Sequence, residues 1–596
     1  MKVSDYVAQR LAHLGVSDCF AVTGGGAMHL NDSFGECEQI KCWYMHHEQA
    51  AAIAAEGYAR ISRKPAILNV TTGPGAINAL NGVFGAFTDS VPMIVVAGQV
   101  RSDTISTTVE GNVVRQLGDQ ELRSIPMVKE ITKYQKLVLT ADDLITTIDD
   151  AFFQSISGRP GPVWIEIPVN IQGLNIDADP EASPILQPDG IEKDDDYGCI
   201  EILQRISEAK RPVILSGSGV RIAGVEDLVL QLAVSTSTPI VTAWTHDTIQ
   251  SDHPLFAGRA GTIGTRPGNF CVQASDLVIV LGSRLNIRQV SYNWDSFAKN
   301  AEIIWIDIDS SEFDKPYMRR KSVTRINADL KDVLPALLNS SLEMNFNHTR
   351  WISWCQEIKN KYDLKSSDYF STSEGINAYH LIPEISELAS ADTTLVCGNA
   401  TACIVPFQAA SLRDGMRMFS NSGSASMGYD LPASLGAAIA DQKRRVVCLA
   451  GDGSIMMNIQ ELESLKNWNL DVLVIVLENQ GYLSIKQTQQ NFFGHDHGAS
   501  PKSGITFPDY EAVANAFGIK SARLDPSADW KKQLSDFMSL SGPRFLLAPL
   551  EISQEFIPRL KSKMVEGSIV TPELDDMFPH LSDQELHEVR ESARKL

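Results

Sequence analysis

The chain has 596 residues, a formal net charge of −21 and an apolar content of 43%. A chain of this length exceeds what one hydrophobic core usually supports, so we expect three domains. The negative charge argues against nucleic acid or an anionic membrane as a partner. Nine cysteines without a C-x-x-C pair, and the lack of an apolar run of 18 residues, predict a soluble, cytoplasmic protein without a disulfide scaffold or zinc site.

Short apolar runs alternate with helix-like stretches over about residues 1–175. The runs read as β-strands at 19–22, 66–70, 93–97 and 163–167. Such alternation predicts a parallel sheet that helices cover on both faces. Glycine-rich segments, Thr23-Gly24-Gly25-Gly26 and Thr71-Thr72-Gly73-Pro74-Gly75, follow two of the runs, and His46-His47-Glu48 opens an alanine-rich helix between them.

A polar stretch at about 177–196 reads as a linker and leads to a second α/β block at about 190–340. Its predicted strands lie at 212–216, 239–243, 277–281 and 303–308. A further polar segment precedes a third block at about 375–550, and residues 551–596 form a tail without a strand pattern. The sequence therefore predicts an α/β protein with three parallel-sheet blocks.

Two successive strands of the third block end in polar residues. Gly451-Asp452-Gly453-Ser454 ends one apolar run, and Glu478-Asn479-Gln480 ends the next, with a helix-like stretch between them. Such a βαβ unit places both strand ends side by side, where open α/β sheets bind ligands. Asp452 and Asn479 offer two hard oxygens that suit Mg²⁺, which phosphate oxygens and water would complete. This pattern predicts an anchor for a diphosphate.

The order of the glycine loop, H-E-Q, T-G-P-G-A, M-G-Y-x-L-P, G-D-G-S and E-N-Q resembles the thiamine diphosphate (ThDP) enzymes, and within them the acetohydroxyacid synthases. The resemblance spans about residues 1–555. It implies ThDP and Mg²⁺ as cofactors and three doubly wound parallel-sheet domains of the pyruvate oxidase/decarboxylase type. These are a pyrimidine-binding domain (1–175), a central domain (190–340) and a diphosphate-binding domain (375–550).

The resemblance assigns catalytic roles in the first domain. Glu48 holds the position of the glutamate that bonds the aminopyrimidine ring and activates the cofactor. Gln120 aligns with the active-site glutamine, and Gly26 is expected beside the reacting carbon, where a side chain would block the substrate. His29 is a candidate for proton transfer together with the neighbours of Glu48, or else a loop-lining residue. Asp119 replaces a usual phenylalanine after an extra stretch at about 105–115, so we expect a remodelled pocket wall.

In the third domain, Met427 matches the bulky residue that holds ThDP bent. Asp452, Asn479 and the backbone carbonyl of Gly481 are the expected Mg²⁺ ligands. Glu478 replaces a usual asparagine, so we expect a carboxylate near the metal. The expected diphosphate contacts are Asn399, Ala400, Gly453 and Ser454.

The central domain matches the flavin-binding positions of the acetohydroxyacid synthases, in which FAD is structural rather than redox-active. Some relatives keep the domain and lose the flavin. The expected FAD contacts are Gly261, Arg284, Arg288 and Asp307.

Two positions after the metal motif concern the acceptor substrate. Ser484 and Thr488 stand where a methionine and a tryptophan are usual, which favours a bulky, hydroxylated acceptor over pyruvate. Together with L-G-D-Q-E and M-G-Y-D-L-P, the chain resembles carboligases that decarboxylate pyruvate and add the two-carbon unit to a nucleotide-linked keto-sugar. An acetolactate synthase, a flavin-dependent pyruvate oxidase and a non-catalytic homologue remain as alternatives.

Two further hypotheses concern the tail and the assembly. Either the tail lies on the surface, or Phe556, Met564, Met577 and Phe578 fold back over the mouth of the active site. Glu48 and the metal motif lie in different domains, and in the family the glutamate reaches ThDP held by another subunit. The resemblance therefore implies a homodimer or homotetramer.

Overall fold

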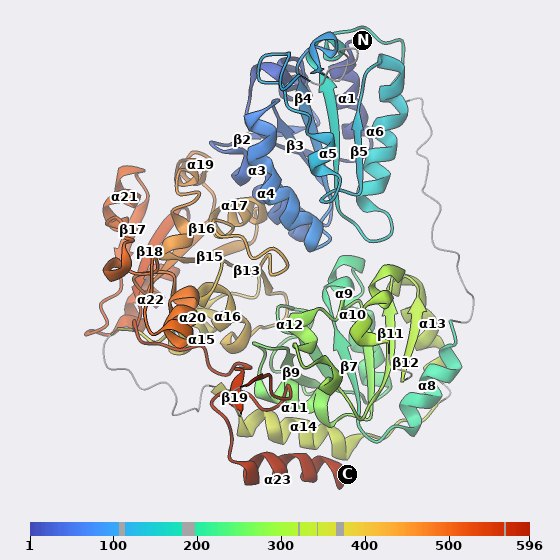
Figure 1. Cartoon of the computed structure of the whole chain (residues 1–596), viewed down its shortest axis with the longest axis vertical. Coiled ribbons are helices and arrows are strands. Elements are labelled where there is room, and N and C mark those ends of the chain that lie inside the picture. The colour runs from blue at the N-terminus through green and yellow to red at the C-terminus, as the bar shows by residue number, and fades with distance from the viewer. Residues whose placement is uncertain (107–113, 182–196, 320–321, 343, 365–374, 566–567) are drawn as a thin grey trace.

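The computed structural model describes residues 1–106, 114–181, 197–319, 322–342, 344–364, 375–565 and 568–596. Three α/β domains, each built around a six-stranded parallel sheet, confirm the predicted fold class (Figure 1). Most of the predicted 177–196 linker, the centre of the extra stretch at 105–115 and the side chain of Met564 lie outside the description. Among the described helices, none combines the length and apolar content of a membrane span.

The first domain has the strand order β2-β1-β3-β4-β6-β5. Its strands are β1 (Asp18–Ala21), β2 (Lys41–Tyr44), β3 (Ala66–Val70), β4 (Met93–Gln99), β5 (Tyr134–Leu137) and β6 (Pro162–Pro168). Its helices are α1 (Val3–His13), α2 (Met28–Glu36), α3 (Glu48–Ser62), α4 (Pro74–Thr88), α5 (Ile125–Val128), α6 (Ala141–Ile156) and α7 (Val169–Gln172). The inner strands are fully buried, as expected for a sheet covered on both faces.

The central domain has the strand order β12-β11-β10-β7-β8-β9. Its strands are β7 (Pro212–Ser216), β8 (Ile240–Ala243), β9 (Phe256–Ala260), β10 (Leu277–Leu281), β11 (Glu302–Asp307) and β12 (Val323–Asn327). Its helices are α8 (Cys199–Glu208), α9 (Ser218–Ala223), α10 (Glu226–Ser235), α11 (Arg266–Ala274), α12 (Ile287–Val290), α13 (Leu330–Ser341) and α14 (Thr349–Lys361).

The third domain repeats the pattern as β14-β13-β15-β16-β18-β17. Its strands are β13 (Thr393–Cys397), β14 (Arg417–Phe419), β15 (Arg445–Gly451), β16 (Val472–Glu478), β17 (Lys520–Arg523) and β18 (Arg544–Pro549). Its helices are α15 (Ala378–Leu388), α16 (Thr401–Ala409), α17 (Asp430–Ala440), α18 (Asp452–Ile455), α19 (Glu461–Asn467), α20 (Leu483–Phe493), α21 (Tyr510–Ala516) and α22 (Trp530–Met538).

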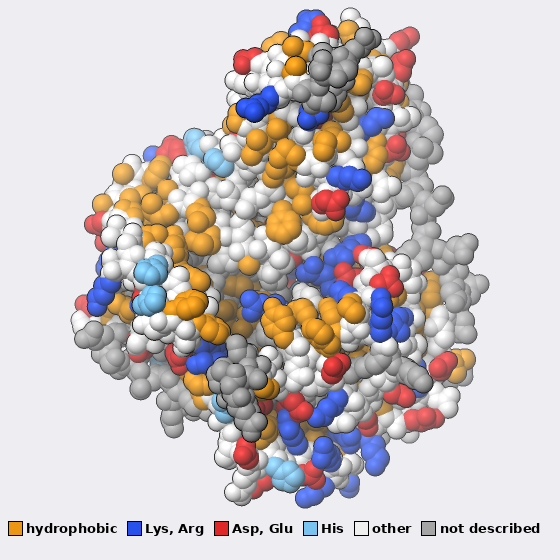
Figure 2. Space-filling view, viewed as in Figure 1, with side chains coloured by type: hydrophobic (Ala, Val, Ile, Leu, Met, Phe, Trp, Pro, Cys, Tyr) orange, Lys and Arg blue, Asp and Glu red, His pale blue; other side chains and the backbone are white. Residues whose placement is uncertain are grey.

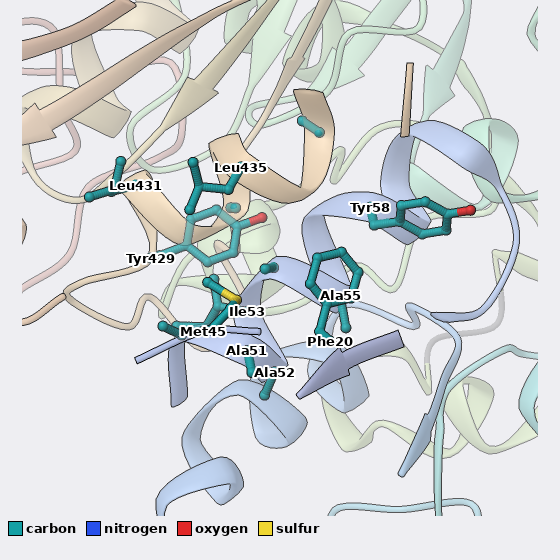
Figure 3. Close-up of a cluster of buried hydrophobic side chains, with 14 of the residues drawn as sticks. Phe20, Met45, Ala51, Ala52, Ile53, Ala55, Tyr58, Tyr429, Leu431 and Leu435 are labelled. Atoms are coloured by element: carbon teal, nitrogen blue, oxygen red, sulfur yellow. The ribbon is translucent and has the colours of Figure 1, made fainter. Parts of the chain in front are cut away.

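The first and third domains share one hydrophobic core, because α3 lies directly on α17. Figure 3 shows Met45, Ala51 and Ile53 of the first domain beside Tyr429 and Leu435 of the third. Small residues let the two backbones approach closely. The Tyr429 hydroxyl crosses the interface and donates to the buried Glu56 carboxylate at 2.7 Å. The helix that Glu48 begins is thus anchored in the domain that carries the metal motif.

The C-terminal tail packs on the rest of the chain. It forms the short hairpin β19 (Lys563–Val565) and β20 (Ser568–Val570), and then α23 (Asp583–Arg594), which lies along α14 (Figure 1). Phe556 is 3% exposed within the core of the third domain, and Met577 is fully buried in the central domain, where its sulfur accepts from Asn269 at 3.2 Å. This placement corrects the expectation that Phe556 and Met577 fold over the mouth of an active site.

Candidate functional site

Asp452 lies at the carboxyl end of β15, where it begins α18, and is 3% exposed. Its carboxylate accepts from the backbone N–H of Gly453 at 2.8 Å and of Gly481 at 3.1 Å. Burial raises the pKa of Asp452 to about 7, although these hydrogen bonds favour the charged form. A cation beside this carboxylate would favour its ionised form.

Asn479 follows the neighbouring strand β16 and is 7% exposed. Its amide nitrogen donates to the hydroxyl of Thr401 at 3.3 Å, a contact that the sequence did not suggest. Its side-chain oxygen is buried and has no hydrogen-bond partner among the described residues. Because a buried acceptor without a partner is costly, this oxygen is a fitting ligand for a metal ion.

Asp452 and Asn479 therefore fit Mg²⁺, which prefers a few protein oxygens together with phosphate and water. No group of three or more His, Cys, Asp or Glu side chains in the described ranges could hold a metal by itself. Gly481 has a φ of +147°, and a Cβ there would collide with the carbonyl oxygen of Ala499. The glycine is therefore required to bring this turn, and its N–H, to Asp452.

Glu478, whose carboxylate is expected near the metal, has a partner of its own. Its side chain forms an ion pair with Arg523 of β17, with 3.1 Å between Nη2 and Oε1. The charge of Glu478 still contributes to the raised pKa of Asp452, but less than burial does. Arg523 therefore holds this carboxylate, and Asn479 remains the ligand candidate on β16.

The loop that carries Met427 is fixed by residues expected to contact the diphosphate. The side chain of Asn399 donates to the carbonyl of Ser426 at 2.5 Å. The hydroxyl of Ser454 accepts from the N–H of Gly428 at 2.9 Å and donates to Asp430 at 2.6 Å. Asn399 and Ser454 thus use their side chains to position half-buried Met427.

Two other expected diphosphate contacts have local structural reasons. Ala400 has a φ of 48° and precedes the first turn of α16. A Cβ on Gly453 would lie 2.6 Å from Cδ1 of Tyr482 and closer still to another ring atom. Glycine at 453 therefore leaves room for the Tyr482 ring beside Asp452.

On the first domain, Glu48 is half-buried at the start of α3. His47 caps this helix, because its Nδ1 accepts from the N–H of Gln49 at 3.1 Å. The Glu48 carboxylate accepts from Asn78 of α4 at 3.0 Å. A Cβ on Gly75 would lie only 3.2 Å from Oε1 of Glu48. Glu48 thus lies against the first turn of α4, and Asn78 is a partner that the sequence did not predict.

Gln120 also lies against the segment that leads into α4, at Gly73. Its φ is 61°, and a Cβ on Gly73 would collide with its carbonyl oxygen. The side chains of Asp119 and Gln120 are both exposed. Glu121 organises this turn by accepting from the N–H groups of Ser106, Leu117 and Gly118 at 2.6, 2.7 and 3.2 Å.

Gly26 and His29 have different surroundings. The N–H of Gly26 donates to the hydroxyl of Thr71 at 3.0 Å, and a Cβ there would lie 2.8 Å from the methyl group of Thr72. Contact with the Thr71–Thr72 turn is therefore sufficient to explain the glycine. The His29 ring lies against Gly173, where a Cβ would be 3.0 Å from its Nε2. The turn before α4 thus adjoins Gly26, Glu48 and Gln120, whereas His29 contacts the end of α7.

The four residues expected to contact FAD have different surroundings in the structure. Arg284 donates to the carbonyl of Thr88 at 2.6 Å and lies 3.7 Å from the Asp89 carboxylate, so it joins the central domain to the first. This contact gives the Arg284 guanidinium partners in the first domain, and its use on a phosphate stays a prediction. Asp307 is 7% exposed, and burial raises its pKa to about 6. Gly261 has a φ of +144°, and the side chain of Arg288 is exposed.

Ser484 and Thr488 are exposed on one face of α20, one turn apart. The Thr488 hydroxyl donates to the carbonyl of Ser484 at 2.9 Å. The helix begins two residues after Gly481, so this face starts beside the candidate metal site. Its other face, with Leu483 and Gln487, lines a cavity of about 700 Å³.

The comparisons with known proteins agree with this geometry. Residues 1–122 match the family model described as the thiamine pyrophosphate enzyme N-terminal TPP binding domain. Residues 200–337 match the central domain of these enzymes, and residues 398–548 match the C-terminal TPP binding domain. Thiamine pyrophosphate is another name for ThDP.

Three relatives illustrate the similarity. The acetolactate synthase isozyme 2 large subunit of Escherichia coli (strain K12) is 30% identical over 92% of this chain and 95% of its own length. The probable acetolactate synthase 2 of rice, Oryza sativa subsp. japonica, is 30% identical over 94% and 85%. The acetolactate synthase large subunit of Lactococcus lactis subsp. lactis (strain IL1403) is 29% identical over 88% of each chain.

The matches cover all three sheets and both halves of the candidate site. The metal motif, the Met427 loop and the Glu48 helix lie within the two matched ThDP-binding domains. This chain therefore belongs to the thiamine diphosphate enzymes and is an acetolactate synthase-like enzyme.

Proposed function

We propose that the enzyme decarboxylates pyruvate and transfers the two-carbon unit to a ketone, and that the ketone is a nucleotide-linked keto-sugar. The observation that carries the acceptor proposal is the exposed pair Ser484 and Thr488 on α20, close to the candidate metal site. Small hydroxyl side chains at these positions leave space and offer hydrogen bonds to a large hydroxylated acceptor.

Several side chains have assigned roles in this proposal. Asp452 and Asn479 would hold Mg²⁺, and Met427, on the loop fixed by Asn399, would pack against the cofactor. The chemistry that ThDP supplies when bound is a nucleophilic carbon. Glu48, oriented by Asn78, holds and returns a proton at the pyrimidine ring. Asp452 and Asn479 are buried, whereas Glu48 is half-buried and open on one side.

Acetolactate synthesis, with pyruvate as donor and acceptor, is the second candidate. The names of the relatives favour it, because all three reported above are acetolactate synthases. The two candidates differ only in the acceptor, so a competition experiment separates them.

The purified protein with ThDP and Mg²⁺ should release CO₂ from pyruvate and form an adduct with a nucleotide-linked keto-deoxysugar, identified by mass spectrometry. The variant Thr488→Trp should lower the ratio of keto-sugar product to acetolactate by about tenfold or more, because the indole fills the acceptor space. Gln489→Ala, at the next position of α20, is the control. Acetolactate as the sole product, with the same yield in Thr488→Trp, would instead support the second candidate.

We also propose that the central domain binds FAD in a structural role, with Gly261, Arg288 and Asp307 as contacts. Buried Asp307 offers an acceptor to a ribose hydroxyl, and Gly261 permits close approach of the dinucleotide. Flavin absorption of the purified protein, and flavin released by heat, test this directly. A colourless protein that takes up no added FAD would remove the flavin from the proposal.

A homodimer is the proposed active assembly. Ile77, Phe84 and Phe87 form an exposed apolar stripe along α4, 46%, 41% and 36% exposed, next to Asn78 and Glu48. Figure 2 shows hydrophobic side chains gathered over this region. Burying this stripe against a second copy would also cover the open side of Glu48. Light scattering of the wild type should give the molar mass of a dimer or a larger oligomer, and Phe84→Lys should lower this mass towards that of the monomer. A monomeric, active wild type would contradict the proposal.

A further inference from the structure

A buried polar cluster lies beneath the turn that carries Gln120, and none of the roles above uses it. Glu166 of β6 is 2% exposed and accepts a hydrogen bond from the hydroxyl of Ser124, which is 1% exposed. Ser124 follows Gln120 by four residues. The carboxyl group is thus tied to the chain segment that leaves the Gln120 turn.

Gln99, at the end of the neighbouring strand β4, connects two segments. Its side-chain nitrogen donates to the carbonyl of Leu122 at 2.7 Å. Its oxygen accepts from the hydroxyl of Thr72 and from the N–H of Val100, each at 2.8 Å. One buried amide therefore bridges the segment after Gln120 and the segment before α4, and its hydrogen-bonding groups are satisfied on both sides.

The same two segments touch above this bridge. Gly73, the residue after Thr72, has no room for a side chain because the backbone of Gln120 covers it. Gly75, two residues further on, lies against Glu48, because a Cβ there would be 3.2 Å from the carboxylate oxygen Oε1. A displacement of either segment would therefore move Gln120 relative to Glu48.

We propose that Gln99 and Glu166 are positioning residues that hold the Gln120 turn over the first turn of α4, beside Glu48. That the position of the Gln120 turn matters for catalysis rests on the function proposed above. That Gln99 and Glu166 hold this turn in place does not depend on that function. Neither side chain contacts the exposed face of the turn, so both act through Leu122 and Ser124.

Below about pH 7, Glu166 performs this role as a neutral acid. Burial raises its pKa to about 7, and the groups that act on it are Ser124, Gln99 and Trp164, none of which is charged. Its neighbours across the sheet are Ala97 of β4 and Leu137 of β5, which are also uncharged. As the pH rises through about 7, a buried negative charge forms, and the described residues that act on Glu166 include no cation to balance it. The turn should therefore loosen on the alkaline side.

The test compares Gln99→Ala, Glu166→Ala and Glu166→Gln in the full-length protein. The first readout is limited trypsin digestion, with cleavage after exposed Arg115 and Arg123 followed by mass spectrometry, because it reports on the turn without any activity. The second readout is kcat and KM for CO₂ release from pyruvate between pH 6 and 9.

Both alanine variants should raise the cleavage rate after Arg123 by about tenfold, the equivalent of one lost hydrogen bond. They should also lower kcat by about as much while KM stays within about twofold. Glu166→Gln keeps the neutral hydrogen-bonding group, so it should resemble the wild type at pH 6 and keep its activity and slow cleavage at pH 8.5, where the wild type declines.

Asp149→Asn is the matched control. Asp149 is another buried carboxylate of this domain; it lies on α6 and pairs with Arg10 of α1 at 2.7 Å rather than with the segment after Gln120. It should lower the melting temperature without changing the cleavage after Arg123. Unchanged cleavage in both alanine variants, or equally faster cleavage in Asp149→Asn, would overturn the inference. A wild type without activity on pyruvate would instead refute the proposed function, and the digestion would still test the positioning role.

Discussion

The contact between α3 and α17 makes a strong prediction for Gly436→Ala. A Cβ at this position would collide with the carbonyl oxygen of Ala54 and lie 2.7 Å from the backbone nitrogen of Tyr58, whereas real Cβ contacts begin at about 3.0 Å. Both obstacles are backbone atoms of α3, so no side-chain rotation relieves them. The two helices have to separate by several tenths of an ångström or more.

The magnitude follows from two opposing effects. Overpacking a tight contact costs about 1–3 kcal/mol, occasionally more. Alanine in place of glycine within a helix returns about 1 kcal/mol. Because the clash involves rigid backbone in a shared core, we expect the cost to win, with a net loss of about 2 kcal/mol and a melting temperature lower by about 4–8 °C.

The control is Gly35→Ala in α2, which is also helical. There a new Cβ meets only the hydroxyl of Tyr44, at 3.3 Å, and we expect little change or a slight stabilisation. Differential scanning fluorimetry measures both variants, and CO₂ release from pyruvate reports whether Glu48 has moved with α3. A Gly436→Ala protein as stable and as active as Gly35→Ala would refute the close contact of these helices.

Three further predictions follow from buried polar groups. Asn479→Ala should abolish Mg²⁺-dependent ThDP binding in calorimetry with little change in the melting temperature. The oxygen it removes has no partner among the described residues, and its amide nitrogen makes a long hydrogen bond of 3.3 Å to Thr401. Loss of stability together with intact binding would contradict the ligand role. Asp247→Asn should cost about 3 kcal/mol or more, because Asp247 is 8% exposed and pairs with Arg417 at 2.8 Å and with Arg221 at 3.4 Å. Burial alone would raise the pKa of Asp247, but these cations and a backbone N–H lower it. The stability that Asp247 contributes is therefore present above about pH 4 and is lost below it. An acid-melting profile that Asp247→Asn leaves unchanged would contradict this role. Burial raises the pKa of Glu166, so its contribution to the free energy of unfolding is complete below about pH 4.5 and falls by about 3 kcal/mol as the pH rises to about 7. Chemical denaturation between pH 4.5 and 8 measures this fall, and Glu166→Gln should abolish it.

The metal motif could be predicted from the sequence because it depends on local order. Gly451 of β15 pairs with Leu477 of β16, so the residues that follow each strand emerge next to each other. A right-handed βαβ connection has essentially one solution, and its spacing is visible in the chain. The same holds for α3, whose start at Glu48 follows from a cap and a run of helix-forming residues.

Partners remote in the chain could not be predicted in this way. Arg523 lies 45 residues from Glu478, and Thr88 lies 196 residues from Arg284. Nothing in the local pattern distinguishes an arginine that binds a phosphate from one that joins two domains. The same limit applies to Gln99, whose position in β4 indicates burial but not its bond to Leu122.

By itself, the sequence determined the three parallel sheets, the strand ends that carry Asp452 and Asn479, and the order of the motifs, because hydrophobic periodicity and turn residues act over short distances. Only the tertiary structure decided which charged and polar groups form ion pairs or hydrogen bonds with one another. Arg523 forms an ion pair with Glu478, and Arg284 joins two domains. The side-chain oxygen of Asn479 has no partner among the described residues. Such pairing depends on the packing of whole domains, since a buried polar group takes whatever partner the folded chain brings within hydrogen-bonding distance.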